Sequence, residues 1–278
     1  MNTNKLLRFR DSAEFFACPV CNAELRLWEH SLRCAGGHCY DIAKYGYVNL
    51  LLHTKREKNY SKDSFLKRKQ ILENGYYSHI LKELLAVLED YDTGSVLLDA
   101  GCGEGYYASE VSKHTAKTIL AFDIVKDSVQ LAAQRDSGNL VRWFVGDLAK
   151  IPLRRQCVDS ILNIFSPANY AEFDRVLKPG GYLIKVIPGE NHVKELRAAA
   201  KDALVNKEYS NEQIAGYFEQ HYPLLEKRKC SATYQMPQEH LEAFVEMTPL
   251  LFHVDKEHID REQIKEVTVE AEILLGRR

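Results

Sequence analysis

The stretch Val96-Leu-Leu-Asp99-Ala-Gly101-Cys-Gly103-Glu-Gly105-Tyr-Tyr107 decides the fold of this chain. It begins with an apolar run typical of a buried strand, passes through alternating glycines and enters a helical pattern. Glycines allow the backbone of such a turn to approach a ligand closely, and the N-terminus of the following helix favours an anionic group. The stretch therefore predicts a strand, a ligand-binding turn and a helix.

The spacing of the glycines separates two classes of ligand. The dinucleotide pattern G-x-G-x-x-G requires glycine at position 106, where this chain has Tyr106. The pattern Asp-x-Gly-x-Gly-x-Gly, which runs from Asp99 through Gly101 and Gly103 to Gly105, fits S-adenosylmethionine instead. We expect the methionine carboxylate of that cofactor to lie against the turn.

Acidic residues end three successive predicted strands. Asp99 ends the first strand, and Asp123 ends the second, where a carboxylate can accept hydrogen bonds from both ribose hydroxyls. Asp147 follows the third strand, where it can help to hold the adenine. A single aspartate is more often a helix cap or turn residue, but three at successive strand ends favour a nucleoside site. Asp159 precedes the fourth strand, and we interpret it as structural.

The segments on both sides of the glycine turn alternate between strand-like and helix-like patterns. A helix is expected where apolar residues recur over 80–88, and another over 193–205. The segment 264–275 alternates apolar and charged residues, as an antiparallel edge strand of a hairpin would. The fold class predicted is α/β: a Rossmann-like class I methyltransferase sheet, mostly parallel with an antiparallel edge strand. Further strands are expected over 95–99, 118–123, 140–145, 158–165 and 182–187, and further helices over 106–114, 127–135 and 171–177.

A cluster of cysteines near the N-terminus has the spacing of a zinc site. Cys18, Cys21, Cys34 and His38 form a C-x2-C-x12-C-x3-H array, and three thiolates with one imidazole complete a zinc tetrahedron. Cys39 is an alternative fourth ligand, although Gly36-Gly37 favours His38 at the tight turn. Four protein ligands leave no open position, so the pattern predicts a structural metal. A segment this short, with few large apolar side chains, requires such a link to fold.

The composition is that of an ordinary globular protein. The 278 residues are 45% hydrophobic and 27% charged, which excludes a disordered or fibrous chain. The longest apolar runs are too short to span a bilayer, and residues 1–17 read as a short leader without the apolar core of a secretory signal. Clustered cysteines in such a chain favour metal binding over disulfides, and hence a cytoplasmic protein with no membrane partner.

The charge is distributed unevenly. The net charge is −2, but residues 44–69 carry eight basic side chains and two acidic ones, a net of +6. We expect this segment to contact phosphate and to leave the cofactor site untouched, although a solvated helix face is the simpler interpretation.

The chain is divided into a zinc-binding module (1–52), a basic neck with a linking helix (53–94) and an S-adenosylmethionine-dependent methyltransferase domain (95–278).

These motifs together resemble a known family. Cys-Pro-x-Cys, Cys…Gly-His, the stretch from Tyr40 to Leu51 (Tyr-Asp-Ile-Ala-Lys-Tyr-Gly-Tyr-Val-Asn-Leu-Leu) and the glycine turn closely resemble the 23S rRNA (guanine-N1)-methyltransferases of the RlmA/RrmA type, and the chain is similar to the Gram-positive branch. The resemblance implies a zinc ribbon that helps to grip a 23S rRNA hairpin, bound S-adenosylmethionine and a homodimer. It implies methylation of a loop guanine near the macrolide-binding exit tunnel, and in some members antibiotic resistance.

The resemblance also places four residues at the cofactor. Tyr77, in Asn74-Gly-Tyr-Tyr77, is expected to lie over it, and Tyr107 and Ala108 to open the helix after the glycine turn. His192, in Pro188-Gly-Glu-Asn-His192, is expected to reach the methionine end. Without the resemblance, Tyr77 is interpreted as helix packing and His192 as a residue at a helix N-terminus.

The loop 165–170, after the fourth strand of the predicted sheet, is where the acceptor should lie. It lacks the Asn/Asp-Pro-Pro-aromatic motif of methyltransferases that act on exocyclic amines, which favours a ring nitrogen. Glu172 is the nearest candidate base, but it is better interpreted as a carboxylate in the first turn of a helix, so no catalytic residue is assigned. Two alternatives remain: a zinc-bearing methyltransferase of small molecules, and a non-catalytic ribosome-binding assembly factor.

Overall fold

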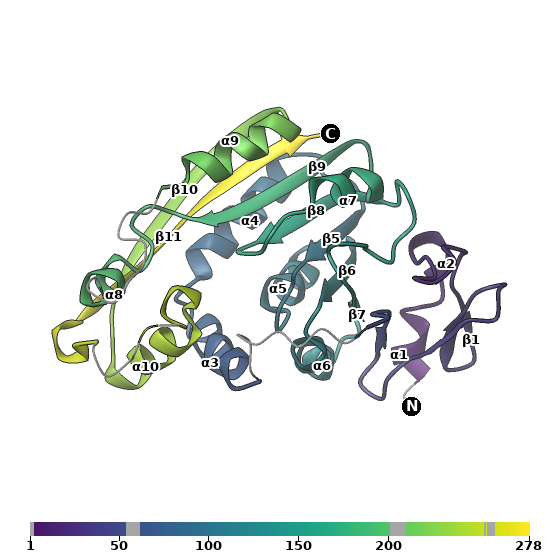
Figure 1. The fold of residues 1–278 in the computed structure, drawn as a ribbon, viewed down its shortest axis with the longest axis horizontal. Coiled ribbons are helices and arrows are strands. Elements are labelled where there is room, and N and C mark those ends of the chain that lie inside the picture. The colour runs from purple at the N-terminus through teal and green to yellow at the C-terminus, as the bar shows by residue number, and fades with distance from the viewer. Residues whose placement is uncertain (1–2, 54–61, 201–209, 253, 255–258) are drawn as a thin grey trace.

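The core of the protein is an eight-stranded sheet, seen in a computed structural model that describes residues 3–53, 62–200, 210–252, 254 and 259–278. The strand order is β10-β11-β9-β8-β5-β6-β7-β4, and β11 alone runs antiparallel to its neighbours (Figure 1). The strands are β4 (Tyr47–Asn49), β5 (Val96–Ala100), β6 (Thr118–Asp123), β7 (Val141–Val145), β8 (Val158–Ile164), β9 (Leu177–Pro188), β10 (Leu224–Gln235) and β11 (Glu266–Arg277).

Helices cover both faces of this sheet, which explains why the central strands are mostly apolar. All five residues of β5 are buried, as expected for a parallel strand packed on both sides. One face packs against α4, α5 and α6, and the other packs against α7 and α9. These helices are α4 (Ser78–Asp90), α5 (Tyr106–His114), α6 (Lys126–Arg135), α7 (Tyr170–Val176) and α9 (Glu212–His221).

Three further helices gather at the carboxyl ends of β8 and β9 (Figure 1). They are α3 (Lys62–Glu73), α8 (Lys194–Ala199) and α10 (Gln238–Met247), and two short 3-10 turns, η1 (Pro249–Leu251) and η3 (Arg261–Gln263), follow α10. α3 packs against α10, so segments far apart in the sequence enclose this end of the sheet. No helix among the described residues is both long and apolar enough to cross a membrane.

The predicted alternation of strands and helices is confirmed, with one correction at the sheet edge. The segment expected to be the edge strand is β11, which lies between β9 and β10. The outer strand is β10, which the sequence analysis missed although its residues alternate between partly buried and exposed. The helix expected over 193–205 ends at Ala199, and residues 201–209 lie outside the described part of the chain.

The N-terminal segment forms a small module beside the β7 edge of the sheet (Figure 1). It holds α1 (Thr3–Leu7), α2 (Ser12–Phe15) and a three-stranded sheet of β1 (Arg26–Trp28), β2 (Ser31–Arg33) and β3 (Cys39–Asp41). Its last strand, β4, does not stay in the module: Tyr47, Val48 and Asn49 pair with β7. The large sheet therefore begins before residue 52, the end that the sequence analysis gave to the module.

Residues 3–17 are more than a leader, because they dock onto the large domain. Arg8 is buried, forms an ion pair with Asp136 at 3.2 Å and donates to the Val141 carbonyl at 2.7 Å. The ring of Phe16 packs edge-on against Phe144 of β7 at 5.2 Å between centroids. These contacts fix the module against α6 and β7.

Candidate metal and cofactor sites

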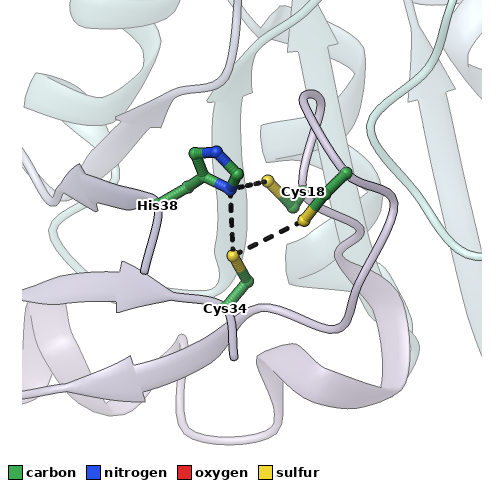
Figure 2. A group of neighbouring side chains, drawn as sticks. Cys18, Cys34 and His38 are labelled. Atoms are coloured by element: carbon green, nitrogen blue, oxygen red, sulfur yellow. Dashed lines mark hydrogen bonds between the residues drawn. The ribbon is translucent and has the colours of Figure 1, made fainter. Parts of the chain in front are cut away.

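The four predicted metal ligands converge on one point in the N-terminal module. The ligand atoms of Cys18, Cys21, Cys34 and His38 all lie within 4.8 Å of one another. His38 Nδ1 lies 3.6 Å from Cys18 Sγ and 3.3 Å from Cys34 Sγ, and Figure 2 shows the ring pointing toward these sulfurs. Cys21 Sγ lies 3.7 Å from Cys34 Sγ. Such separations match neighbouring corners of a zinc tetrahedron with bonds of about 2.0–2.3 Å.

The geometry favours His38 over Cys39 as the fourth ligand. The side chain of Cys39 is exposed and lies outside the group, where its sulfur accepts a hydrogen bond from Arg33 Nε at 3.3 Å. Cys18 Sγ also lies 3.2 Å from the hydroxyl of Tyr40, which can donate to a thiolate and steady it. Three sulfurs and one imidazole suit zinc and leave no position for substrate.

The glycine turn between β5 and α5 adopts the conformation that its sequence predicts. Gly101 has φ +84°, and a Cβ there would collide with Ser166 Oγ. Gly103 has φ +56° and donates its backbone N–H to Asp123 Oδ2 at 2.9 Å. Gly105 is the N-cap of α5 with φ +81°. Side chains at these positions would strain the turn and block its contacts, so the turn holds only with glycine.

The three predicted acids gather at the carboxyl ends of neighbouring strands. Asp99 is the last residue but one of β5, and its burial raises the pKa of its carboxyl to about 7. Asp123 is half-buried at the end of β6, and its Oδ1 accepts the Val125 N–H at 2.9 Å. Asp147 follows β7 and caps its own turn by accepting the Ala149 N–H at 2.8 Å. Their common location agrees with a nucleoside site along this edge.

Two acids that the sequence analysis interpreted as structural are structural. Asp159 accepts the Val96 N–H at 2.8 Å and pairs with Lys178 at 2.7 Å. Glu172 accepts the Ile151 N–H and pairs with Arg175, both at 2.7 Å. Their carboxylates are engaged in holding loops, so neither is placed to serve the acceptor.

Arg68, a residue of the basic neck, lies against the glycine turn that is predicted to hold the cofactor. The guanidinium packs over the glycine turn, where a Cβ on Gly103 would lie 3.2 Å from it. Its Nε lies 3.5 Å from the carboxylate of Glu104, which is buried. Lys69, its neighbour on α3, pairs with Glu73 at 2.8 Å. The neck residues Lys55, Arg56 and Lys58 lie outside the described residues.

A cavity of about 340 Å³ opens beside the glycine turn, under α3 and the segment after α10. Tyr77, Tyr107 and His192 line it, as does Arg68, while Asp123 and Asp147 lie outside it. The ring of Phe165 stacks on His192 at 5.8 Å, and Tyr77 meets both rings edge-on at 6.0 Å. Aromatic faces gathered in this way attract a cation such as a sulfonium.

His192 is held as a neutral imidazole. Burial lowers the pKa of His192 to about 4. Its Nδ1 accepts the Glu270 N–H at 3.2 Å, so the proton of the neutral ring is assigned to Nε2, which lies 3.5 Å from the Tyr77 hydroxyl. Ala108 is buried in α5 beside Tyr107 and packs in the core under the turn.

The loop expected to face the acceptor borders the same cavity. Phe165 follows β8 with φ +48°, a conformation that costs energy for a bulky residue and that clusters at functional sites. Ser166 lines the cavity beside it and packs against Gly101. The loop therefore joins the glycine turn to the surface where a substrate would enter.

Comparison with known proteins matches both parts of the chain. Residues 16–58 match the family described as RlmA, N-terminal, a zinc ribbon, and residues 98–185 match a methyltransferase domain. A Bacillus subtilis protein provisionally named 23S rRNA (guanine-N(1)-)-methyltransferase YxjB is 30% identical over 94% of this chain and 96% of its own. The 23S rRNA (guanine(748)-N(1))-methyltransferase of Streptomyces fradiae is 27% identical over 91% of each chain.

Solved structures agree on the fold. A chain from a complex between the Haloferax volcanii Trm112 methyltransferase activator and a provisionally named methyltransferase superposes with a TM-score of 0.52 over 81% of this chain and 99% of its own, at 16% identity. At that identity the likeness concerns the sheet and its helices alone.

Proposed function

Since this chain belongs to the family of RlmA-type 23S rRNA (guanine-N1)-methyltransferases, we propose that it transfers a methyl group from S-adenosylmethionine to N1 of a loop guanine in 23S rRNA, near the exit tunnel. The observation that carries the proposal is the pairing of two sites in one chain. A glycine turn with three strand-end acids adjoins an aromatic cavity, and a Cys3His cluster lies in a ribbon beside the same sheet.

The chain's own residues divide the cofactor between them. Asp123 would accept from the ribose hydroxyls, and Asp147 would lie by the adenine. Arg68 would face the methionine carboxylate, since it is the cation packed on the glycine turn. Tyr77, Phe165 and His192 would surround the sulfonium. When bound, S-adenosylmethionine supplies an electrophilic methyl group, so the protein's task is to position and desolvate the acceptor.

The zinc ribbon would serve recognition and not catalysis. Its four ligands leave no open coordination position, and its exposed surface carries Trp28 with Arg33 over the indole at 5.8 Å. Stacking and cationic side chains of this kind suit a looped RNA. A 23S rRNA substrate would also place the protein in the cytoplasm. We further propose the homodimer that the resemblance implies, which light scattering of the purified protein tests directly.

A methyl-transfer assay separates the proposed function from its alternatives. Deproteinised rRNA from a strain lacking this gene is incubated with labelled S-adenosylmethionine and the protein, and its nucleosides are then analysed. Label in 1-methylguanosine supports the proposal. Label in a small metabolite but not in RNA would favour the small-molecule methyltransferase, and no label in either would favour the assembly factor.

The control for that assay is Gly101→Val. A valine at φ +84° would collide with Ser166, so the variant should lose cofactor binding and all label. Label that survives in this variant would come from a contaminating methyltransferase.

A further inference from the structure

Lys185 is a buried lysine whose position the fold alone does not explain. It lies in β9 with 4% of its surface exposed. Its Nζ donates to Asn163 Oδ1 at 2.6 Å and to the Ser166 carbonyl at 3.2 Å. Within the described part of the chain, no carboxylate lies within ion-pair distance of it. A lysine is rarely buried without a charge partner, because the ammonium loses its hydration.

The amine lies where two hollows meet. It lines the inner cavity together with Tyr77 and His192, and it also lines an outer hollow of about 510 Å³ with Tyr217 of α9. The Tyr217 side chain is 55% exposed and offers a ring on which a base could stack. Lys185 thus lines the outer hollow with Tyr217 and the inner cavity with His192.

Guanine N1 carries a proton that must leave when the methyl group arrives. Among the described residues that line these two hollows there is no Asp or Glu. His192 is a poor acceptor, since its Nδ1 already accepts a backbone N–H and its Nε2 bears the ring proton. Burial raises the pKa of Tyr77 and of Tyr107, so both hydroxyls stay protonated.

We propose that Lys185 is the general base that accepts the N1 proton of the target guanine. The proposal rests on the proposed function. In the step, a bond forms between N1 and the methyl carbon while the bond from that carbon to sulfur breaks, and the sulfonium becomes a neutral thioether. The N1 proton passes to Nζ, which becomes an ammonium and later releases the proton to water.

The hydrogen bonds of Lys185 suit the neutral amine. A neutral amine has two N–H bonds and one lone pair, and two acceptors, on Asn163 and Ser166, already take the two protons. Burial lowers the pKa of Lys185 to about 8, close to the range in which a base works at neutral pH. On either side of it in the sheet stand uncharged residues, Asn163 and Leu274.

Among the described residues, the charged groups other than Lys185 that line the two hollows are cations. They are Arg68 and Arg197, both at the inner cavity, and burial is the cause that lowers the pKa of Lys185. Burial raises the pKa of Tyr77, Tyr107 and Tyr170, so these phenols are neutral near pH 7. Burial lowers the pKa of His192, so its imidazole is neutral as well.

The test compares Lys185→Met and Lys185→Arg with the wild type in single-turnover methylation of an rRNA hairpin across a pH series. The wild-type rate should rise about tenfold per pH unit and level off near the pKa of Lys185. Lys185→Met should be slower by about 10²–10⁴-fold at neutral pH. The difference in rate between Lys185→Met and the wild type should shrink at high pH, because guanine N1 then loses its proton without a base. Lys185→Arg should be equally slow, since a guanidinium cannot accept the proton.

Three further measurements keep the result interpretable. Lys178→Met changes a half-buried lysine at the start of β9 that pairs with Asp159 and lines neither hollow; it is the matched control and should keep the wild-type profile. Calorimetry should give unchanged S-adenosylmethionine affinity for the Lys185 variants. NMR of the Lys185 side-chain nitrogen in the wild-type protein reports its pKa directly, without reference to activity. An ordinary lysine pKa for Lys185, or a Lys185→Arg rate close to that of the wild type, would show that Lys185 acts as a fixed cation and not as the general base.

The same assay tells this failure from failure of the proposed function. If the wild type forms no 1-methylguanosine, the proposed function is wrong, whatever the variants do. If the wild type forms it and Lys185→Met keeps the wild-type rate and pH profile, the function stands and the role of Lys185 falls.

Discussion

Replacing Arg68 by Gln tests whether one guanidinium serves both the fold and the cofactor. Arg68 Nε lies 3.5 Å from Glu104 Oε1, and the two side chains are 23% and 2% exposed. Burial raises the pKa of the Glu104 carboxyl, and Arg68 opposes the rise. Asp99 and Asp123 lie in the same cluster. Without Arg68, these acids would face one another in a buried site.

The size of the effect follows from that geometry. At 3.5 Å and an effective dielectric constant near 20, the pair attracts by about 5 kcal/mol before desolvation. Removing one partner of a buried pair costs about 3–5 kcal/mol, and partial exposure of Arg68 places the expected loss at the lower end, about 3 kcal/mol. Loss of a charge-assisted hydrogen bond to the methionine carboxylate, about 1.5–3 kcal/mol, should weaken S-adenosylmethionine by about 10- to 150-fold.

The pH dependence has a definite sign. Without Arg68 the folded state holds protons on Glu104 and Asp99 at a pH where the unfolded chain has already released them. The free energy of unfolding of Arg68→Gln should therefore fall more steeply than that of wild type as pH rises from about 4 toward 8. The difference between the two proteins should be smallest in acid, where both acids are protonated in either state.

Urea unfolding followed by circular dichroism measures stability, and titration calorimetry measures cofactor affinity. Lys67→Gln is the matched control: it removes the same charge one position earlier in α3, from a side chain that lines neither hollow, and should change stability by less than about 0.5 kcal/mol. An unchanged dissociation constant for S-adenosylmethionine in Arg68→Gln would mean that Arg68 does not contact the cofactor. Unchanged stability at pH 8 would mean that Glu104 is protonated even beside the guanidinium.

Three more substitutions follow from the sites. Asp99→Asn should stabilise the free protein by a few kcal/mol at about pH 8 but not in acid, because a carboxyl with a pKa of about 7 destabilises the fold as pH rises from about 4 through 7. Equal melting temperatures of variant and wild type at both pH values would contradict this. Asp123→Ala should cost roughly 1–3 kcal/mol of S-adenosylmethionine affinity by calorimetry and free the Gly103 amide; full affinity would move the ribose elsewhere. Cys21→Ala should release zinc, measured by a chromogenic chelator, and weaken hairpin binding more than cofactor binding; normal methylation by the metal-free protein would refute a role for the ribbon in recognition.

The cofactor turn and the metal cluster were predictable because both are local patterns. The alternation of glycines fixes the turn between β5 and α5, and four ligands within 21 residues fix the ribbon. The spacing of apolar residues likewise predicted most of the central helices and strands, and α5 and β6 have the predicted bounds. Such features depend on neighbours in the sequence, which a single chain displays.

What the sequence concealed depends on contacts between distant segments. Arg68 read as one more cation in a basic segment, and only the packing of α3 over the turn brings it to Gly103. Lys185 interrupts an apolar strand, a signal that could have been noticed, but its partners on β8 and the following loop come from the fold. β4 is three residues long, and no local pattern says that it pairs with β7.

The strand β4 makes the ribbon a poor candidate for modular exchange. Its residues 47–49 occupy the edge of the sheet beside β7, and Leu50 continues the contact by donating to the Val145 carbonyl at 2.9 Å. A chain cut after residue 52 would bare that edge, whose unpaired backbone groups invite association with other strands. Grafting this ribbon onto another methyltransferase would likewise add a strand to the recipient's sheet. Swaps should therefore be planned around the edge of the sheet, with the junction placed before residue 47 so that β4 stays in the large sheet.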